Sequence, residues 1–150
     1  MHNPRNLYTL GESVSFGAEG TNSVFLADGW SAQEERHRWT EGPQAGLSFR
    51  LQERDAKKDI LLRLKASAYL GRGIPHQEIG VFANEKKIAS WQMKGLDWYE
   101  AIVPSGLIGK EGLLNIVFTI SKPTSPSDIS KSKDTRKLGI AVRELILRDL

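Results

Sequence analysis

The sequence predicts an all-β protein, an antiparallel β-sandwich with jelly-roll-like connections and about 8–10 strands. Hydrophobic and polar residues alternate one by one through several segments, as expected for strands with one buried face. Clusters of Gly, Pro, Asn and Ser separate these segments and indicate turns. No long amphipathic helical pattern competes with the alternation. Short strands joined by turns are typical of two-layer sandwiches.

Three segments show the alternation clearly: residues 45–53, 59–70 and 113–121. In residues 59–70 the apolar side chains from Ile60 to Leu70 occupy every second position, with polar side chains between most of them. Because successive side chains of a strand point to opposite faces, each segment is predicted to bury one face.

The C-terminal segment, residues 137–150, changes phase within its length. Leu138 and Val142 belong to one alternation, whereas Leu145 and Leu147 belong to the other. A one-residue phase change inside a strand is what a β-bulge produces. The same residues also fit a short terminal helix, so both alternatives remain open at this point.

Shorter segments complete the predicted set of strands. They are residues 13–18, 23–27, 78–84, 87–93 and 99–104. A hairpin is predicted to turn at Asn84 and Glu85, because Asn tolerates the positive φ angle that tight turns require. Residues 121–137 are rich in Ser, Lys, Asp and Pro and are predicted to form a long polar surface loop.

The length of 150 residues predicts one domain, residues 1–150, which is either a whole protein or a module cut from a larger one. Hydrophobic residues make up 39% and charged residues 26%, which is ordinary for a globular protein. The net charge of +3 reflects 21 basic against 18 acidic residues, and this small excess argues against a nucleic-acid partner.

The chain contains no cysteine, so it needs no disulfides and no oxidising compartment. No apolar run approaches the roughly 20 residues that span a bilayer, so no direct membrane insertion is expected. These features leave the compartment undetermined but favour a soluble protein of the cytoplasm.

Signatures of catalysis are missing. The sequence has no G-x-S-x-G elbow, no phosphate-binding glycine loop and no H-E-x-x-H pair. The three histidines, His2, His37 and His76, do not stand at metal-ligand spacing. We therefore expect no enzyme, no metal site and no cofactor. A calcium site built from backbone carbonyls has no sequence motif, so the sequence does not exclude it.

The stretch GWSAQEERHRWT, residues 29–40, carries the candidate binding site. Trp30 and Trp39 bracket a charged segment that is predicted to be a loop. An indole face suits the apolar surface of a pyranose ring, and charged groups suit its hydroxyls. Trp30, Glu34, Arg38 and Trp39 are therefore predicted to bind a saccharide. The alternative is that these tryptophans close the end of the core.

Two further sets of charged residues allow other interpretations. Asp28 and Glu34, if a loop brought them together, could form the carboxylate pair of a small hydrolase or lyase, although solvated loop carboxylates are the simpler interpretation. Asp134 and Arg136 precede the last strand and are predicted to form a charge-assisted pair that anchors the 121–137 loop to the sheet.

Residues 29–49 and 125–147 resemble the β-sandwich accessory domains of bacterial glycosyltransferases and other proteins of surface-polysaccharide synthesis. The residues that carry the resemblance are Gly29, Trp30, Glu34, Arg38, Trp39, Thr40 and Gly42 in the first segment, and Ser125, Pro126, Ser132, Asp134, Arg136, Leu138, Gly139, Ile140 and Val142 in the second. The resemblance implies a β-sandwich that works near cell-surface glycans. It implies no catalytic mechanism.

The expected function is that of a non-catalytic, carbohydrate-binding-like accessory module linked to bacterial polysaccharide synthesis. Its expected partner is a saccharide or polysaccharide, with a glycosyltransferase or another protein as a further partner. The main alternative is a scaffolding domain that binds proteins through a sheet face or an edge strand.

Overall fold

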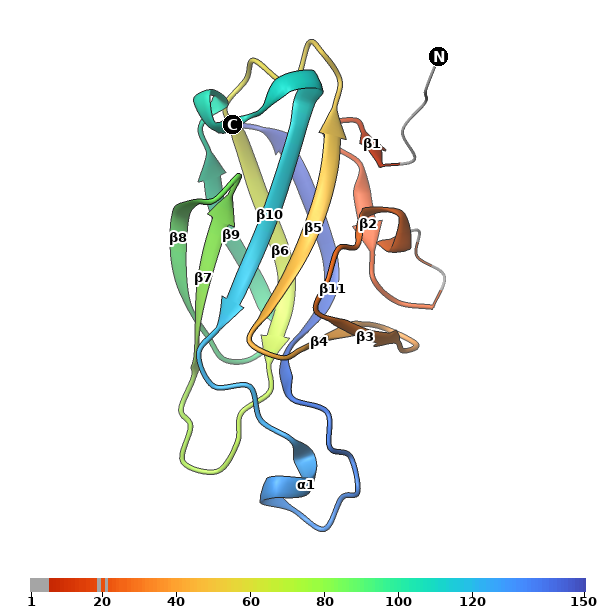
Figure 1. Cartoon of the computed structure of the whole chain (residues 1–150), viewed down its shortest axis with the longest axis vertical. Coiled ribbons are helices and arrows are strands. Elements are labelled where there is room, and N and C mark those ends of the chain that lie inside the picture. The colour runs from red at the N-terminus through yellow and green to blue at the C-terminus, as the bar shows by residue number, and fades with distance from the viewer. Residues whose placement is uncertain (1–5, 19, 21) are drawn as a thin grey trace.

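Two β-sheets pack face to face (Figure 1). The computed structural model describes residues 6–18, 20 and 22–150. Sheet A has the strand order β1-β5-β10-β7-β8, and sheet B has the order β3-β4-β11-β6-β9, with β2 also paired to β11. In Figure 1 the strands β5, β10 and β7 of sheet A lie in front of β6 and β11 of sheet B. The predicted β-sandwich is confirmed.

The described residues contain eleven strands, against about 8–10 predicted, because residues 7–8, 30–33 and 38–41 also form strands, whereas the predicted strand at residues 23–27 does not. In chain order the strands are β1 (Leu7–Tyr8), β2 (Ser13–Ser15), β3 (Trp30–Gln33), β4 (Arg38–Glu41), β5 (Gln44–Leu51), β6 (Ile60–Ala68), β7 (Gln77–Ala83), β8 (Lys86–Met93), β9 (Asp97–Val103), β10 (Leu113–Ile120) and β11 (Leu138–Asp149). The pairing is antiparallel except between β1 and β5, which run parallel.

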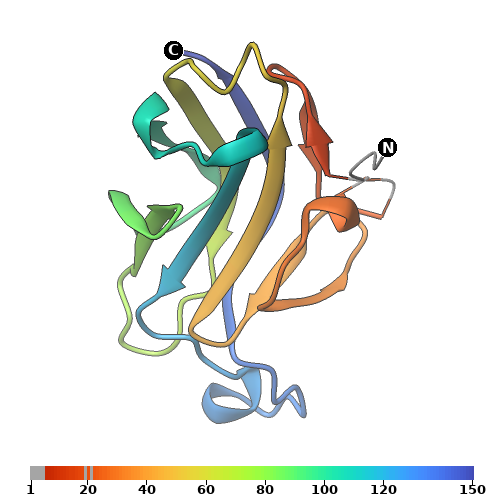
Figure 2. The ribbon, with the colours of Figure 1, turned by 45° about the horizontal axis from the view of Figure 1, so that its top comes forward.

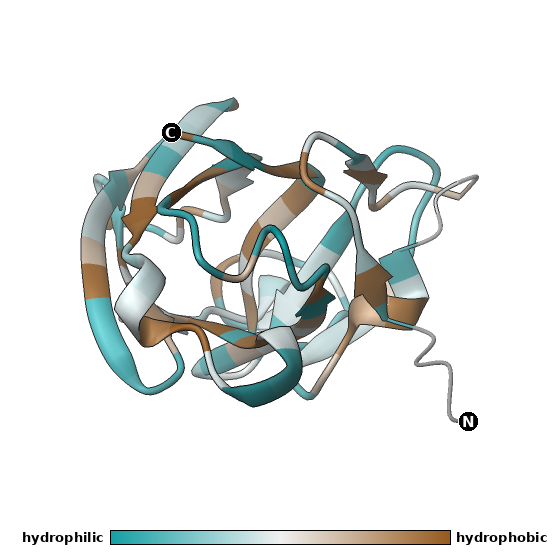
Figure 3. Ribbon diagram, turned by 90° about the horizontal axis from the view of Figure 1, so that it is seen from above, coloured by the Kyte–Doolittle hydropathy of each residue, from teal (hydrophilic) through white to brown (hydrophobic). Residues whose placement is uncertain are grey.

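The core lies between the inner faces of the two sheets. The alternation in β5, β6 and β10 places their apolar residues there, and seen from above the strands carry alternating hydrophobic and hydrophilic bands (Figure 3). The fully buried side chains of these strands include Leu47, Phe49, Ile60, Leu62, Leu64, Leu114, Ile116 and Phe118. The alternation ends earlier than predicted, because β6 stops at Ala68 and Leu70 is 37% exposed.

Strand β11 contains the predicted bulge. Its register with β6 shifts between Val142 and Glu144, so that Val142 and Leu145 both point into the core. The backbone N–H of Phe16 donates to the carbonyl of Arg143 across 2.9 Å at this bulge. The alternative of a terminal helix is wrong.

One predicted strand, residues 23–27, is a 3-10 helix instead, η1 (Asn22–Phe25). Asn22 and Phe25 are both buried, and a 3-10 turn brings residues three apart to one face. The Asn22 amide donates to the carbonyl of Ser15 across 2.9 Å and holds the turn against β2. Two further 3-10 turns are η2 (Ser105–Leu107) and η3 (Lys110–Gly112).

The predicted loop at residues 29–40 is a hairpin rather than a loop. Strands β3 and β4 pair with each other, and β4 also pairs with β11, so the hairpin is the edge of sheet B. The backbone N–H of Glu34 donates to the carbonyl of His37 across 2.8 Å and closes the turn. The charged composition of this segment suggested a loop, but most of the charged residues lie at the turn, and the two tryptophans lie on the paired strands.

The hairpin of β7 and β8 turns at Asn84 and Glu85, as predicted. Both residues have positive φ, 44° for Asn84 and 74° for Glu85, which is the pattern of a type I′ turn. The long loop after β10 carries one short helix, α1 (Pro126–Ile129), which lies beyond the end of the sandwich in Figures 1 and 2. Among the described residues, no helix is long and apolar enough to cross a membrane.

Candidate functional site

Trp30 and Trp39 lie on opposite faces of the β3–β4 hairpin. Trp30 is paired with Thr40, and side chains alternate along each strand, so Trp39 points away from Trp30. The indole N–H of Trp30 donates to the carbonyl of Gly46 across 2.8 Å, and its ring lies 5.5 Å from that of Phe16. Trp30 therefore covers the edge of the core, although it also lines a shallow surface hollow.

Trp39 lies on the outer face of sheet B, half-buried among other aromatic rings. Its ring meets His37 at 5.4 Å and Tyr69 at 5.6 Å, both edge to face. Ala141 is its register partner on β11 and is buried. Of the two predicted platforms, Trp39 is the one whose ring faces away from the core.

Arg38 is occupied by the hairpin itself. Its guanidinium donates to Oδ1 of Asn22 at 3.1 Å, to the carbonyl of Ser31 at 2.8 Å and to Oε1 of Gln33 at 3.3 Å. Burial lowers the pKa of Arg38 from its ordinary value. These contacts use three of the five N–H donors of the guanidinium and fix Arg38 to the hairpin.

Glu34 stands at the turn of the hairpin, close to two basic groups. Its Oε2 lies 3.6 Å from Nε2 of His37 and 3.8 Å from Nη1 of Arg136. No contact joins Glu34 to the side chain of Asp28 among the described residues. Because the two carboxylates of a glycosidase stand roughly 5–10 Å apart without touching, a hydrolase or lyase that uses this pair stays a hypothesis.

Asp134 and Arg136 form a charge-assisted pair at the end of the long loop. Arg136 donates from Nη2 to Oδ2 of Asp134 at 2.7 Å and from Nε to Oδ1 at 3.0 Å. These hydrogen bonds lower the pKa of Asp134 and raise that of Arg136. Nη1 of Arg136 donates to the hydroxyl of Ser31 at 2.8 Å, so the pair ties the loop to strand β3.

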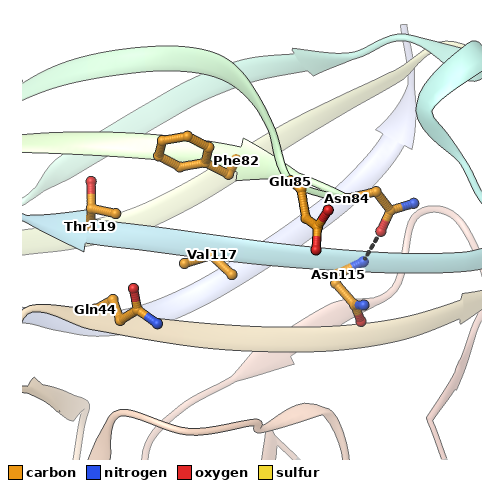
Figure 4. Close-up of a pocket in the computed structure, with 7 residues that line it drawn as sticks. All are labelled: Gln44, Phe82, Asn84, Glu85, Asn115, Val117 and Thr119. Carbon is orange, nitrogen blue, oxygen red and sulfur yellow. Dashed lines mark hydrogen bonds between the residues drawn. The ribbon is translucent and has the colours of Figure 1, made fainter.

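A groove of about 400 Å³ runs over the outer face of sheet A, on the opposite side of the sandwich from Trp39. Figure 4 shows side chains of three strands and the β7–β8 turn arranged around it. The lining residues are Gln44, Phe82, Asn84, Glu85, Asn115, Val117 and Thr119, and together they define what we call the sheet A groove.

The floor of the sheet A groove is apolar and flat. Val117 on β10 lies in register between Gly46 on β5 and Phe82 on β7. Gly80 is the partner of Thr119, and a Cβ there would lie 2.5 Å from Oγ1 of Thr119 and 3.1 Å from the Phe82 ring, so both side chains lie over this glycine. The side chains of Val117 and Phe82 are both partly exposed and form the apolar floor of the groove.

The walls of the sheet A groove are polar, and most of their side chains are unpaired. Within the part of the chain that the structure describes, the side chains of Gln44, Glu85, Asn115 and Thr119 make no hydrogen bond or ion pair. Asn84 differs, because its amide donates to the carbonyls of Leu107 and Leu113 and accepts from the backbone N–H of Asn115. Four side chains are therefore available to a ligand, and Asn84 holds the wall in place.

No group of three or more acidic, His or Cys side chains among the described residues is arranged to hold a metal ion. His2 lies outside the described residues. His76 pairs with Glu78 at 2.9 Å on the surface. A saccharide contact at Trp30, Glu34, Arg38 or Trp39 stays a prediction, and the geometry favours the sheet A groove over that set as a single surface.

The sheet A groove was not predicted from the sequence, although part of its pattern is visible there. Alternation in residues 113–121 places Asn115, Val117 and Thr119 on the face away from the core. Alternation along one strand does not reveal which residues of other strands lie beside it in the sheet. The pairing of Thr119 with Gln44, and of Val117 with Phe82, exists only once the strand order is known.

Neither a protein-family model nor a curated protein sequence matches this chain. Several solved structures are similar to it, among them the following three. The mosquito-larvicidal Cry4Aa toxin of Bacillus thuringiensis has a TM-score of 0.53 at 8% identity, and the match covers 99% of this chain and 25% of the toxin. The acetyl xylan esterase Est2A of the rumen bacterium Butyrivibrio proteoclasticus has a TM-score of 0.50 at 6% identity, covering 93% of this chain and 33% of the esterase.

The third is the CBM36-1 domain of a multidomain xylanase from the hindgut metagenome of Trinervitermes trinervoides. It has a TM-score of 0.48 at 8% identity, covering 93% of this chain and 97% of that domain. At these identities the likeness to the toxin and the esterase shows a common fold, a two-sheet β-sandwich, and nothing about ligand or activity.

Proposed function

We propose that this chain is a non-catalytic saccharide-binding module and that the sheet A groove is its binding site. The observation that carries the proposal is the ring of four unpaired polar side chains around an open apolar floor that contains Phe82. The shared fold does not choose between functions, because a toxin and an esterase both contain it.

The chemistry of the groove suits a sugar ring. A pyranose presents apolar C–H groups on its faces and hydroxyls around its edge. Phe82 and Val117 offer an apolar surface for a face, whereas Gln44, Asn115 and Thr119 offer donors and acceptors for hydroxyls. The volume of about 400 Å³ lies within the range of small-ligand sites.

The wider biological setting is a further part of the proposal. The resemblance at residues 29–49 and 125–147 supports a role beside bacterial surface-polysaccharide synthesis, with a glycosyltransferase as a partner protein. The proposal also includes that the chain is a single domain, that it acts in the cytoplasm and that it has no catalytic activity. The support for these points is the sequence alone.

The test is a glycan-array screen of the purified protein, followed by calorimetric titration of each glycan that binds. Asn115→Ala and Gln44→Ala remove side chains without partners in the fold, so both variants should fold normally and bind at least about tenfold more weakly. Trp39→Ala on the opposite sheet is the matched control and should keep its affinity. If the folded protein bound no glycan on a broad array, or if both groove variants kept the wild-type affinity, the proposal would be wrong.

A scaffolding role through the outer face of sheet B is the second candidate. Ile102 on edge strand β9 is 49% exposed, and Arg63 lies 4.5 Å above the ring of Trp98 on the same face. Exposed aliphatic, aromatic and arginine side chains are common at protein interfaces. Analytical ultracentrifugation with and without Ile102→Asp tests it, since an interface at this face would show a partner complex that the variant abolishes.

A further inference from the structure

Glu85 occupies a backbone position that disfavours its residue type. It is the second residue of the two-residue turn between β7 and β8, and its φ of 74° lies in the left-handed region. Asn and Gly are the residues that turns of this kind prefer, Gly above all at the second position. Strained residues of this kind gather at binding sites, where the surrounding structure maintains them.

The turn that carries Glu85 is fixed by its neighbour. The Asn84 amide donates to the carbonyls of Leu107 at 2.6 Å and Leu113 at 2.9 Å, and its Oδ1 accepts from the backbone N–H of Asn115 at 2.8 Å. Three hydrogen bonds therefore join the turn to strand β10 and the segment before it. The Glu85 side chain starts from a backbone that is held in place.

The Glu85 carboxylate lies over β10, beside Asn115 and at the end of the sheet A groove (Figure 4). Within the described residues no Lys, Arg or His lies within ion-pair distance of it, and the groove lining contains no basic residue. Lys87 stands on this face as the register partner of Phe82, but it does not line the groove.

We infer that the sheet A groove selects saccharides that carry a free ammonium group, deacetylated amino sugars, with the Glu85 carboxylate as the partner of that group. This inference rests on the proposed function and deepens it. A carboxylate forms a stronger hydrogen bond with an ammonium than with a neutral hydroxyl. It also repels uronic acids and sulfated sugars. The amide oxygen of Asn115, beside Glu85, is a further acceptor for the ammonium hydrogens.

Three tetrasaccharides with the same β-1,4 backbone test the inference by calorimetric titration. Position 2 carries a hydroxyl in the glucose tetramer, an ammonium in the glucosamine tetramer and an acetamide in the N-acetylglucosamine tetramer. We expect the glucosamine tetramer to bind about tenfold more tightly than the glucose tetramer at low salt. In Glu85→Gln, which keeps size and polarity, the two should bind within about twofold of each other.

The outcomes separate the inference from the proposed function. Equal binding of the three tetramers to the wild-type protein, or a preference for the ammonium form that survives in Glu85→Gln, overturns the amino-sugar inference and leaves a saccharide site in place. Binding of none of the three, together with a silent glycan array, overturns the proposed function itself.

Lys87→Gln tests whether binding depends on the charge of the ligand, and it leaves the groove lining unchanged. Removing a nearby positive charge should strengthen binding of the glucosamine tetramer by about twofold at low salt and leave the glucose tetramer unchanged. Weaker binding of the glucosamine tetramer in this variant would contradict the inference.

Discussion

Arg136 donates a hydrogen bond of 2.8 Å to the hydroxyl of Ser31, although 105 positions separate the two residues. The contact joins the two segments whose residues resemble accessory domains of glycosyltransferases. Two more contacts do the same, since the Thr40 hydroxyl accepts from the backbone N–H of Ile140 and the backbone N–H of Gly42 donates to the carbonyl of Lys137. These contacts hold the β3–β4 hairpin against β11 and the loop before it, which is an architectural role.

Arg136→Lys should loosen the long loop. A lysine ammonium cannot reach both oxygens of Asp134 and the Ser31 hydroxyl with the planar fork that arginine offers. We expect the thermal midpoint to fall by about 2–4 °C and hydrogen exchange in residues 125–137 to quicken. Lys133→Gln, an exposed change in the same loop, should leave both unchanged. An Arg136→Lys protein with wild-type exchange rates would show that the contact does not hold the loop.

Gly139→Ala should destabilise the contact between the two sheets. A Cβ at this position would lie 2.7 Å from Cγ1 of Ile120 and 2.7 Å from the hydroxyl oxygen of Thr40, and both neighbours are enclosed. We expect the free energy of unfolding in urea to drop by about 1–3 kcal/mol. Gly95→Ala is the control, because nothing lies within 4 Å of a Cβ there. Similar stability of the two variants would contradict this account of Gly139.

Tyr8 should make the protein sensitive to alkali. Burial raises the pKa of Tyr8 to about 12; the carbonyls of Glu12 and Leu147 share the single hydrogen of its hydroxyl, and its oxygen accepts from the backbone N–H of Leu147. Because the folded pKa lies above the unfolded value of about 10, this contribution is complete below pH 10 and is lost as the pH rises to 12.

Tyr8→Phe removes the titrating group and tests this expectation. At pH 8 the variant should be less stable than the wild type by about 1–2 kcal/mol in urea unfolding, since the hydroxyl hydrogen bonds are lost. The difference should narrow between pH 10 and 12. A gap that stays constant over that range would mean that Tyr8 does not ionise on unfolding.

Glu85→Gly should stabilise the fold while it removes the carboxylate from the groove. Glycine adopts a φ of 74° without the steric cost that a Cβ brings, so the free energy of unfolding should rise by about 0.5–1 kcal/mol. Glu85→Ala keeps the Cβ and should gain nothing. Equal stability of the Gly and Ala variants would show that the turn is not strained at this residue.

Alternation along the chain was sufficient to predict the strands that form the core. The bulge in β11, which alternation favoured beside a terminal helix, and the buried faces of β5, β6 and β10 follow from the order of apolar and polar residues, whereas the hairpin at Asn84 and Glu85 follows from the turn preference of Asn. Each is a local property, because the side-chain period of a strand is fixed by its own backbone.

The strand pairing decided the rest. Residues 29–40 form a hairpin because β11 offers β4 an edge for pairing, which their charged composition conceals. Trp30 and Trp39 look like one platform in the sequence, yet pairing turns them to opposite faces. The sheet A groove exists because β5, β10 and β7 are neighbours, bringing Gln44, Val117 and Phe82 together from distant positions. The backbone of a single strand determines which of its side chains face the core. A site that crosses several strands depends instead on which strands pair by hydrogen bonds.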